Sequence, residues 1–236
     1  MSSMIIAMGL QYRLHKERDI LNGVSFNLNK GEFLAVLGEN GAGKTTLLDL
    51  LMGFRRRTGG QLRVMEEDPD HDAWEARARI GYLSEKVDIP GDWDGEEFLA
   101  FHRRFYNSYD LAREKRLVEQ FKISYEERVG YLSAGEIRRL QIIGALAATP
   151  ELLIADEITA VLDILGRRKF LQVLQEQQKK RGMTVVLATS IPEGLEAYAD
   201  KILLLNRGRQ ILFSETNVLD GRGDLAGAVA ERLERL

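Results

Sequence analysis

A glycine-rich segment with a lysine lies between an apolar run and a stretch that favours helix. Its residues, directly after the run 33–37, are Gly38, Glu39, Asn40, Gly41, Ala42, Gly43, Lys44, Thr45 and Thr46. Glycine lets the backbone wrap closely, so that consecutive amide groups point at phosphate oxygens. A helix beginning near Lys44 adds the positive end of its dipole. The order of strand, glycine-rich turn and helix predicts a phosphate-binding loop for a nucleoside triphosphate.

Two side chains of this loop suit triphosphate chemistry. We expect the ammonium group of Lys44 to reach the β- and γ-phosphates, and the hydroxyl of Thr45 to ligate Mg²⁺. A glycine-rich turn with a chance lysine is the alternative interpretation. The strand before the loop and the helix after it argue against that alternative, so the sequence predicts a triphosphate site with Mg²⁺.

Two carboxylates follow a second apolar run. Residues 152–155 read LLIA, and Asp156 and Glu157 come next. At the end of a strand, Asp156 is suited to hold Mg²⁺ through its water shell, and Glu157 to orient or deprotonate the attacking water. Taken alone, this pattern fits equally well a strand that ends in a solvated acidic turn. Together with the phosphate-binding loop, the pair indicates a hydrolytic site.

A third segment, Leu132–Glu136, precedes a helical stretch at 137–148. Ser133 and Glu136 have the spacing of a capping box, in which the serine caps free amides and the glutamate reaches back. That structural role is sufficient to explain both residues. The same helix start also offers a hydroxyl, amide groups and a dipole to an anion, so both interpretations stay open.

Apolar runs predict the strands that position these segments, at 33–37, 152–155, 184–188 and 202–205. Helical segments lie between them, which predicts an α/β fold: a P-loop NTPase core with a mainly parallel sheet. Residues 4–10 and 24–28, joined through the turn-prone Leu21–Gly23, suggest an N-terminal antiparallel β addition.

Residues 85–150 differ in character, and we expect an inserted helical lobe there. Phe98, Phe101 and Phe105 fall on one helix face by their spacing. A small helical core is the simpler explanation for these aromatic residues, and an exposed groove for a partner helix is the alternative. We expect a single domain over 1–236, with a core made of 1–84 and 151–236. The tail from Asp224 reads as a short amphipathic helix.

Composition excludes several classes of protein. The chain has 236 residues and a formal net charge of −3, with 36 acidic against 33 basic residues, so we expect no nucleic-acid partner. Cysteine is absent, which excludes disulfides and thiolate metal sites and favours an intracellular location. The apolar runs are too short to span a bilayer, and no secretory leader is apparent. Any work on a membrane would therefore be done through a partner.

A further acid, Asp163, follows the carboxylate pair. In this order and spacing, the loop at 38–46, the segment 132–136 and the acids at 156–163 resemble the nucleotide-binding subunit of ABC transporters. The resemblance covers nearly the whole chain, and its helical segment is most similar to small bacterial exporter types. It implies an ATPase whose nucleotide is ATP, bound with Mg²⁺.

The same resemblance implies roles for four further residues. Tyr12 matches the aromatic residue that stacks on adenine, although a surface tyrosine is an alternative explanation. Ser133 and Gly135 match the motif that touches the γ-phosphate held by the opposite subunit. Asp163 matches the acid that links the two sites. The resemblance thus implies a homodimer or heterodimer that holds ATP between its subunits.

It also implies a location and a membrane partner. The ATPase would be cytoplasmic, peripheral on the inner face of the cell membrane, and would act on one or more permease subunits. ATP-dependent closure of the dimer would then drive export, with the helical lobe receiving a coupling helix of the permease. The cargo would be recognised by the permease, so the sequence gives no substrate.

Several positions depart from the family pattern. Glu85 stands where glutamine is usual; its carboxylate is still suited to ligate Mg²⁺ but adds negative charge beside the γ-phosphate. Ala134 and Glu136 replace glycine and glutamine, and Ile158 replaces proline. Ala134 adds a β-carbon near the approach to the phosphate.

The most consequential departure is Ser190, which follows the run 184–189 where the family places a histidine. That histidine contacts the γ-phosphate and braces the catalytic glutamate, which here is Glu157. A serine hydroxyl is shorter and carries no imidazole, so it would reach the phosphate only through water. Slow hydrolysis with intact binding is the expectation.

Two other functions are alternatives to an exporter subunit. A non-transport relative, acting as an ATP-binding switch or assembly factor with slow hydrolysis, is slightly favoured by Ser190. The single-domain length and the intact helical lobe favour transport. A nucleotide kinase would account for the loop at 38–46, but not for the segment 132–136 or for Asp163.

Overall fold

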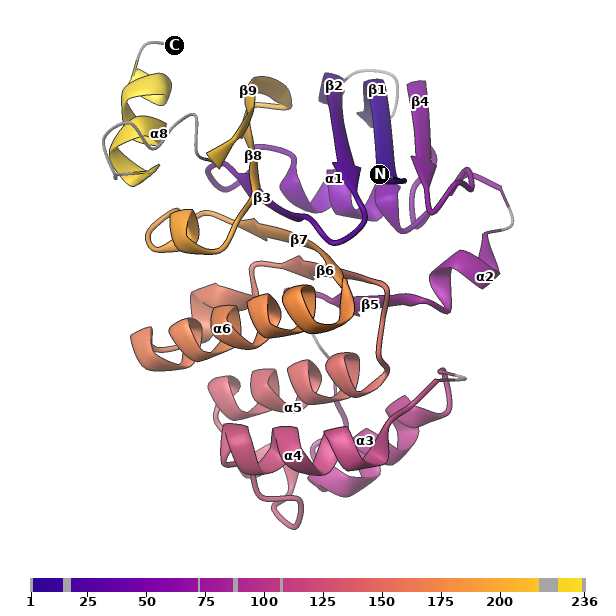
Figure 1. Ribbon diagram of the computed structural model, residues 1–236, viewed down its shortest axis with the longest axis vertical. Helices are drawn as coiled ribbons and strands as arrows, with labels where there is room; N and C mark the ends of the chain where they lie inside the picture. The colour runs from indigo at the N-terminus through magenta and orange to yellow at the C-terminus, as the bar shows by residue number, and fades with distance from the viewer. Residues whose placement is uncertain are drawn as a thin grey trace.

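A six-stranded sheet forms the centre of the molecule (Figure 1). The computed structural model describes residues 2–14, 18–71, 73–86, 89–106, 108–216 and 225–234. The strand order is β5-β6-β7-β3-β8-β9, and all neighbours pair in parallel except β9, which runs antiparallel to β8. The strands are β3 (Phe33–Leu37), β5 (Ile80–Leu83), β6 (Leu152–Asp156), β7 (Thr184–Thr189), β8 (Lys201–Asn206) and β9 (Arg209–Glu215). The predicted mainly parallel sheet is confirmed.

A second, antiparallel sheet has the order β2-β1-β4. Its strands are β1 (Ser3–Leu14), β2 (Arg18–Asn29) and β4 (Gly59–Val64). The N-terminal β addition is therefore confirmed, but the turn expected at Leu21–Gly23 is wrong. Asn22 pairs with Gln11 inside the sheet, and Gly23, at φ 79°, accommodates an irregularity of β2. The segment that joins the two strands lies at 15–17, outside the described residues.

Three helices come between β5 and β6 in the chain and form the lower part of Figure 1: α3 (Gly95–Arg103), α4 (Leu111–Phe121) and α5 (Ala134–Ala147). Among the described residues, the further α-helices are α1 (Lys44–Leu51), α2 (Trp74–Arg77), α6 (Ile164–Arg181) and α8 (Leu225–Glu234). Asp224, the expected start of the last helix, lies outside the described residues. None of the helices within the described ranges is both long and apolar enough to span a bilayer.

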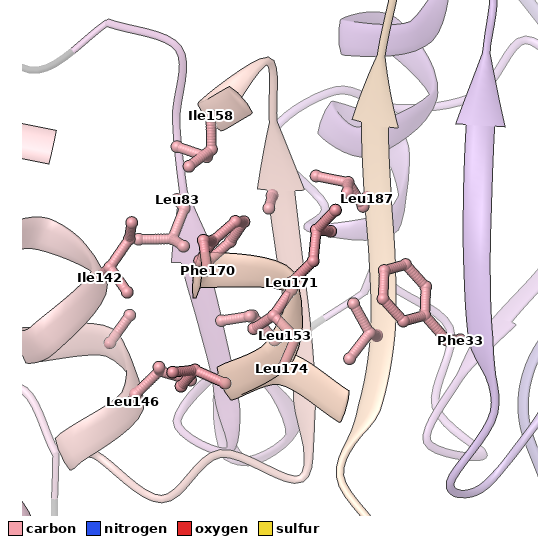
Figure 2. Close-up of a cluster of buried hydrophobic side chains, with 14 of the residues drawn as sticks. Phe33, Leu83, Ile142, Leu146, Leu153, Ile158, Phe170, Leu171, Leu174 and Leu187 are labelled. Carbon is pink, nitrogen blue, oxygen red and sulfur yellow. The ribbon is translucent and has the colours of Figure 1, made fainter. Parts of the chain in front are cut away.

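Alternate residues of β3 face two separate apolar clusters, which shows that both faces of the central sheet are covered. Phe33, Ala35 and Leu37 belong to the cluster that includes Phe170 and Leu174 of α6, shown in Figure 2. Leu34 and Val36 pack toward α1 and the three-stranded sheet. Burial on both faces explains the uninterrupted apolar sequence of the parallel strands. Each such side chain contributes roughly 1.5–3 kcal/mol when fully buried.

The helical segment combines a buried core with exposed aromatic rings. Phe98 and Phe121 are buried, whereas Phe101 and Phe105 are 44% and 62% exposed. The rings of Phe101 and Phe105 lie 5.0 Å apart, centre to centre. The simple core therefore accounts for Phe98, while the other two rings remain on the surface. Phe105 comes just after the end of α3, and its ring still packs against that of Phe101.

Strand register sets where the functional segments meet. Leu37 of β3 pairs with Thr189 of β7, and Asp156 of β6 pairs with Ala188. Because parallel strands end at the same edge of a sheet, the loops after β3, β6 and β7 emerge side by side. The segments expected to bind phosphate and to hydrolyse it are thereby brought together.

Candidate nucleotide site

The loop after β3 turns sharply into α1, and two of its glycines have no room for a side chain. A Cβ on Gly38 would lie 2.5 Å from the carbonyl oxygen of Leu205. Gly43 has φ 103°, and a Cβ there would lie 2.7 Å from Cδ2 of Leu21. Gly43 is also the N-cap of α1, so the helix begins at Lys44 as expected. The free amide groups of the first helical turn are directed at the loop.

Lys44 is buried, and its ammonium group makes two hydrogen bonds and one ion pair. Nζ donates to the carbonyl oxygens of Gly38 at 2.6 Å and Glu39 at 3.1 Å. It also lies 3.0 Å from Oε1 of Glu157, although the two residues are far apart in the chain. The lysine therefore links the main chain of the loop to the acid that follows β6.

Asp156 ends β6 and is 1% exposed. Burial and the negative charges of Glu157 and Glu85 raise the pKa of its carboxyl group, while a hydrogen bond from Thr45 and the charge of Lys44 act in the opposite direction. Its Oδ1 has no hydrogen-bond partner. A buried carboxylate oxygen without a partner, beside a threonine hydroxyl, is an arrangement that a cation would stabilise.

Glu157 has φ 49°, a left-handed conformation that is strained for a residue with a side chain. Its amide donates to the carbonyl oxygen of Ala188 at 2.9 Å, which ties it to β7. Oε2 of Glu157 accepts from the amide of Ser190 at 3.2 Å and from its hydroxyl at 3.4 Å. The carboxylate is thus held between Lys44 on one side and Ser190 on the other.

The oxygen donors beside the loop fit a magnesium ion that is also bound by phosphate oxygens. Thr45, Asp156 and Glu85 offer a hydroxyl and two carboxylates, the hard oxygen ligands that Mg²⁺ prefers. Within the described ranges, no three histidine, cysteine or acidic side chains gather closely enough to hold a metal ion by themselves. These residues therefore suit a metal that arrives with a polyphosphate.

The segment at 132–136 forms the capping box expected from the sequence. Ser133 caps α5, and the amide of Ser133 donates to Oε2 of Glu136 at 2.8 Å. The hydroxyl of Ser133 lies 2.6 Å from the same oxygen. Hydrogen bonds from Ser133 lower the pKa of the Glu136 carboxyl group. A Cβ on Gly135 would lie 3.7 Å from the carbonyl oxygen of Val161, so the helix start borders the segment after β6.

The two remaining expected residues make local contacts. Oδ1 of Asp163 accepts from the amide of Gly166 at 2.6 Å and caps α6. Tyr12 lies in β1, where its hydroxyl accepts from Arg55 at 3.1 Å and the guanidinium lies 5.6 Å from the ring centre. In the described part of the chain, no hydrogen bond or ion pair links Ser133, Asp163 or Tyr12 to Lys44 or Glu157.

Glu85 follows β5, and its negative charge contributes to the raised pKa of Asp156. The main chain at Ser84 and Glu85 is held by Arg138 of α5, whose guanidinium donates to both carbonyl oxygens. No local sequence pattern indicated a role for Arg138. An arginine within a helical stretch reads as a solvated residue, and only the tertiary fold shows that its side chain is buried.

Comparison with known proteins identifies the family. The family model described as "ABC transporter" matches residues 21–160, more than half of the chain. The methionine import ATP-binding protein MetN of Rhizobium etli is 30% identical over 198 residues, covering 80% of this chain and 55% of that protein. The Nod factor export ATP-binding protein I of Burkholderia orbicola is 34% identical over 197 residues, covering 81% and 64%. The chain thus spans under two thirds of the length of these two relatives.

Solved structures agree. The structure of cbiO1 from Clostridium perfringens, described as part of the ABC transporter complex cbiONQ, matches with a TM-score of 0.80 at 25% identity. The match covers 100% of this chain and 97% of that one. The phosphate-binding loop, the strand-end acids and the central sheet all fall within this match. The chain therefore belongs to the ABC transporter family, as an ATP-binding protein.

Proposed function

We propose that this chain is the ATP-hydrolysing subunit of a membrane exporter and that ATP-dependent closure of a dimer drives it. One observation carries the proposal: the Glu157 carboxylate is held between Lys44 and Ser190 at the mouth of the glycine-rich loop. A carboxylate fixed beside the phosphate-binding lysine is suited to take a proton from a water that attacks the γ-phosphate.

The chain's own residues divide the work of the reaction. The loop amides and Lys44 bind and orient the β- and γ-phosphates, so that the transferred group is in line with the attacking water. Thr45, Asp156 and Glu85 would hold Mg²⁺, which supplies neutralisation of the phosphate charge. Glu157 accepts the water's proton once the γ-phosphate has replaced it at Lys44.

Further roles follow from the family and need a second subunit. Tyr12 would stack on adenine, with Arg55 fixing its ring. Ser133 and Gly135 would bind the γ-phosphate held by the partner subunit, and Asp163 would link the two sites. The partner is a second copy or a related ATPase chain. Closure of the two subunits around ATP would move permease subunits docked at the inner face of the membrane.

Export, rather than import, is the direction we propose. The relatives include one named for export and one named for import, so the family by itself leaves the direction open. The short helical segment from Phe105 to Tyr131 resembles that of small exporters. The exposed rings of Phe101, in α3, and of Phe105 offer an apolar surface at the start of this segment for a permease helix.

The alternative function is an ATP-binding switch outside transport, with minimal hydrolysis. Two observations favour it: serine replaces the usual histidine at Ser190, and the Ser133 hydroxyl is engaged by Glu136 within its own helix. Both would slow turnover without preventing ATP from binding.

One purification experiment distinguishes the transport function from the ATP-binding switch. The tagged chain is expressed with the genes adjacent to its own, and membrane and soluble fractions are purified and assayed for ATPase activity with and without the co-purified partner. Recovery with a membrane protein that raises the ATPase rate supports the transport function. Recovery with a soluble partner alone, and no stimulation, would replace it with the switch.

A further inference from the structure

Arg138 of α5 is 7% exposed, yet among the described residues its guanidinium donates to two carbonyl oxygens and one amide oxygen and forms no ion pair with a carboxylate. Nη1 donates to the carbonyl oxygen of Ser84 at 2.5 Å and to Oε1 of Gln141 at 2.9 Å. Nη2 donates to the carbonyl oxygen of Glu85 at 2.5 Å. A planar fork spanning two successive carbonyl groups fixes both of them in direction as well as in distance.

Burying a cation in this way costs free energy, which the three hydrogen bonds must offset. Burial lowers the pKa of Arg138, and the charge of Glu85 acts in the opposite direction. A neutral side chain of similar length would avoid the cost but would leave two carbonyl groups without donors. The contact is therefore specific to an arginine.

The segment held by this fork has no regular secondary structure. β5 ends at Leu83, and Ser84 to Lys86 follow it outside any helix or strand. The side chain of Glu85 is exposed, and its charge acts on Asp156. No strand or helix fixes the main chain here. Besides the hydroxyl of Ser84, which donates to the carbonyl oxygen of Lys86, the two carbonyl contacts with Arg138 hold the segment that carries the Glu85 carboxylate.

The other end of the contact lies on the helix that carries the Ser133–Glu136 segment. Ser133 is the N-cap of α5, and Arg138 lies one turn further along the same helix. A helix moves as a rigid body over such a distance, so a shift of its first turn also shifts the guanidinium. Arg138 therefore joins the segment expected to meet the partner's ATP to the residue expected to serve the chain's own ATP.

We propose that Arg138 is a positioning residue that sets the place of Glu85 at the nucleotide site according to the position of α5. The proposal rests on the proposed function, in which Glu85 acts on the magnesium ion bound with ATP. Arg138 itself would contact neither ATP nor the metal.

The test compares ATP affinity with and without Mg²⁺, measured with a fluorescent ATP analogue on the full chain. Arg138→Met, which keeps the length of the side chain, should reduce the Mg²⁺-dependent gain in affinity at least three-fold and leave Mg²⁺-free affinity unchanged. Arg138→Lys should show the same loss, because one ammonium group cannot reproduce the fork. Arg116→Met also removes one positive charge from the helical segment between β5 and β6. Because Arg116 lies on the exposed face of α4, this variant should match wild type.

A double-variant cycle tests whether Arg138 acts through Glu85. If Arg138 acts through Glu85, then Glu85→Ala combined with Arg138→Met should lose no more of the Mg²⁺-dependent gain than Glu85→Ala alone. Additive losses, equal losses with and without Mg²⁺, or a wild-type Mg²⁺ response in folded Arg138→Met would each overturn the proposal. If Arg138→Met does not fold, Arg138→Lys is judged by the same criteria. Failure of the wild-type chain to bind ATP would refute the proposed function instead.

Discussion

The ammonium nitrogen of Lys44 lies 3.0 Å from Oε1 of Glu157, and their side chains are only 5% and 11% exposed. The residue expected to bind the γ-phosphate is thus neutralised by the residue expected to activate water. In the proposed function, an incoming γ-phosphate would take the place of the Glu157 carboxylate at Lys44. Binding of ATP would then release the carboxylate for catalysis, and this one ion pair would couple binding to activation.

Replacing Glu157 with glutamine should tighten ATP binding while removing hydrolysis. The variant loses the carboxylate that competes for Lys44, so we expect ATP affinity to rise a few-fold. Loss of a general base lowers the rate by about 10²–10⁴-fold. Titration with a fluorescent ATP analogue and a phosphate-release assay measure the two effects.

Glu193→Gln serves as the control, because it removes an exposed carboxylate that is paired only at long range, with Arg167 at 3.9 Å. It should leave affinity and rate near wild type. Unchanged or weaker ATP binding in Glu157→Gln would mean that the ion pair does not compete with the γ-phosphate.

Replacing Ser190 with histidine should speed hydrolysis. An imidazole at this position reaches further than a hydroxyl and is able to contact both the γ-phosphate and Glu157. Ser190→Ala should change the rate less than about three-fold, because a hydroxyl contact of this length is weak and the main-chain amide contact remains. Steady-state ATPase assays with the membrane partner compare the three forms. A wild-type rate typical of transport ATPases, not exceeded by Ser190→His, would show that serine is no defect.

The sequence indicated the residues of the candidate nucleotide site, but not the contacts between distant segments that hold these residues in place. The apolar strand 33–37, the glycines and Lys44 are close in the chain, so their arrangement follows from local rules. The contact between Lys44 and Glu157 depends on the order of β3, β7 and β6 in the sheet, which no local pattern contains. Arg138 was missed for the same reason: its fork reaches carbonyl groups far away in the chain.

Replacing Glu136 with glutamine should strengthen the ATP-dependent dimer. The Ser133 hydroxyl now lies 2.6 Å from a Glu136 carboxylate oxygen, a strong charge-assisted contact. Glutamine keeps the capping box but holds the hydroxyl less tightly and removes a negative charge from the face expected to meet ATP. We expect a several-fold lower dimer dissociation constant in the Glu157→Gln background, measured by analytical ultracentrifugation.

Ser133→Ala is the matched variant for which the opposite effect on the dimer is expected. It should weaken the same dimer and cost about 1 kcal/mol of folding stability through loss of the cap. If Glu136→Gln weakens the dimer as well, the glutamate itself makes a favourable contact across the interface, and the prediction is wrong.

His102 should make the helical segment sensitive to acid. Burial lowers its pKa from 6.5 to about 4, and its Nδ1 has no hydrogen-bond partner. The unfolded chain therefore binds a proton between pH 6.5 and 4 that the folded chain does not, so stability is lost as pH falls through that window. The loss approaches about 3 kcal/mol at pH 4.

Urea unfolding of wild type and His102→Gln from pH 7 to pH 4 measures this difference. The wild-type curve should fall more steeply with acid, whereas His71→Gln, at a residue whose side chain is 80% exposed, should follow wild type. Parallel curves for wild type and His102→Gln would show that His102 is not buried as a neutral group.

Parts of the antiparallel sheet could not be predicted from their local sequence. Asn22 and Gly23 look like a turn, but Gly23 adopts its positive φ inside β2 while the strand keeps pairing with β1. Strand β4 carries two glycines at its start and only two buried residues, Leu62 and Val64, so its apolar signal is short. Pairing with neighbouring strands stabilises these segments as strands, although their local sequence favours strand only weakly.

ATP-dependent dimerisation of Glu157→Gln tests the central claim most directly. Sedimentation velocity with saturating Mg²⁺ and ATP should show a stable dimer, and the same variant without nucleotide should remain monomeric. Adding Lys44→Ala should abolish the ATP-dependent shift. A chain that stays monomeric with ATP in the Glu157→Gln form would contradict both the transport function and the switch.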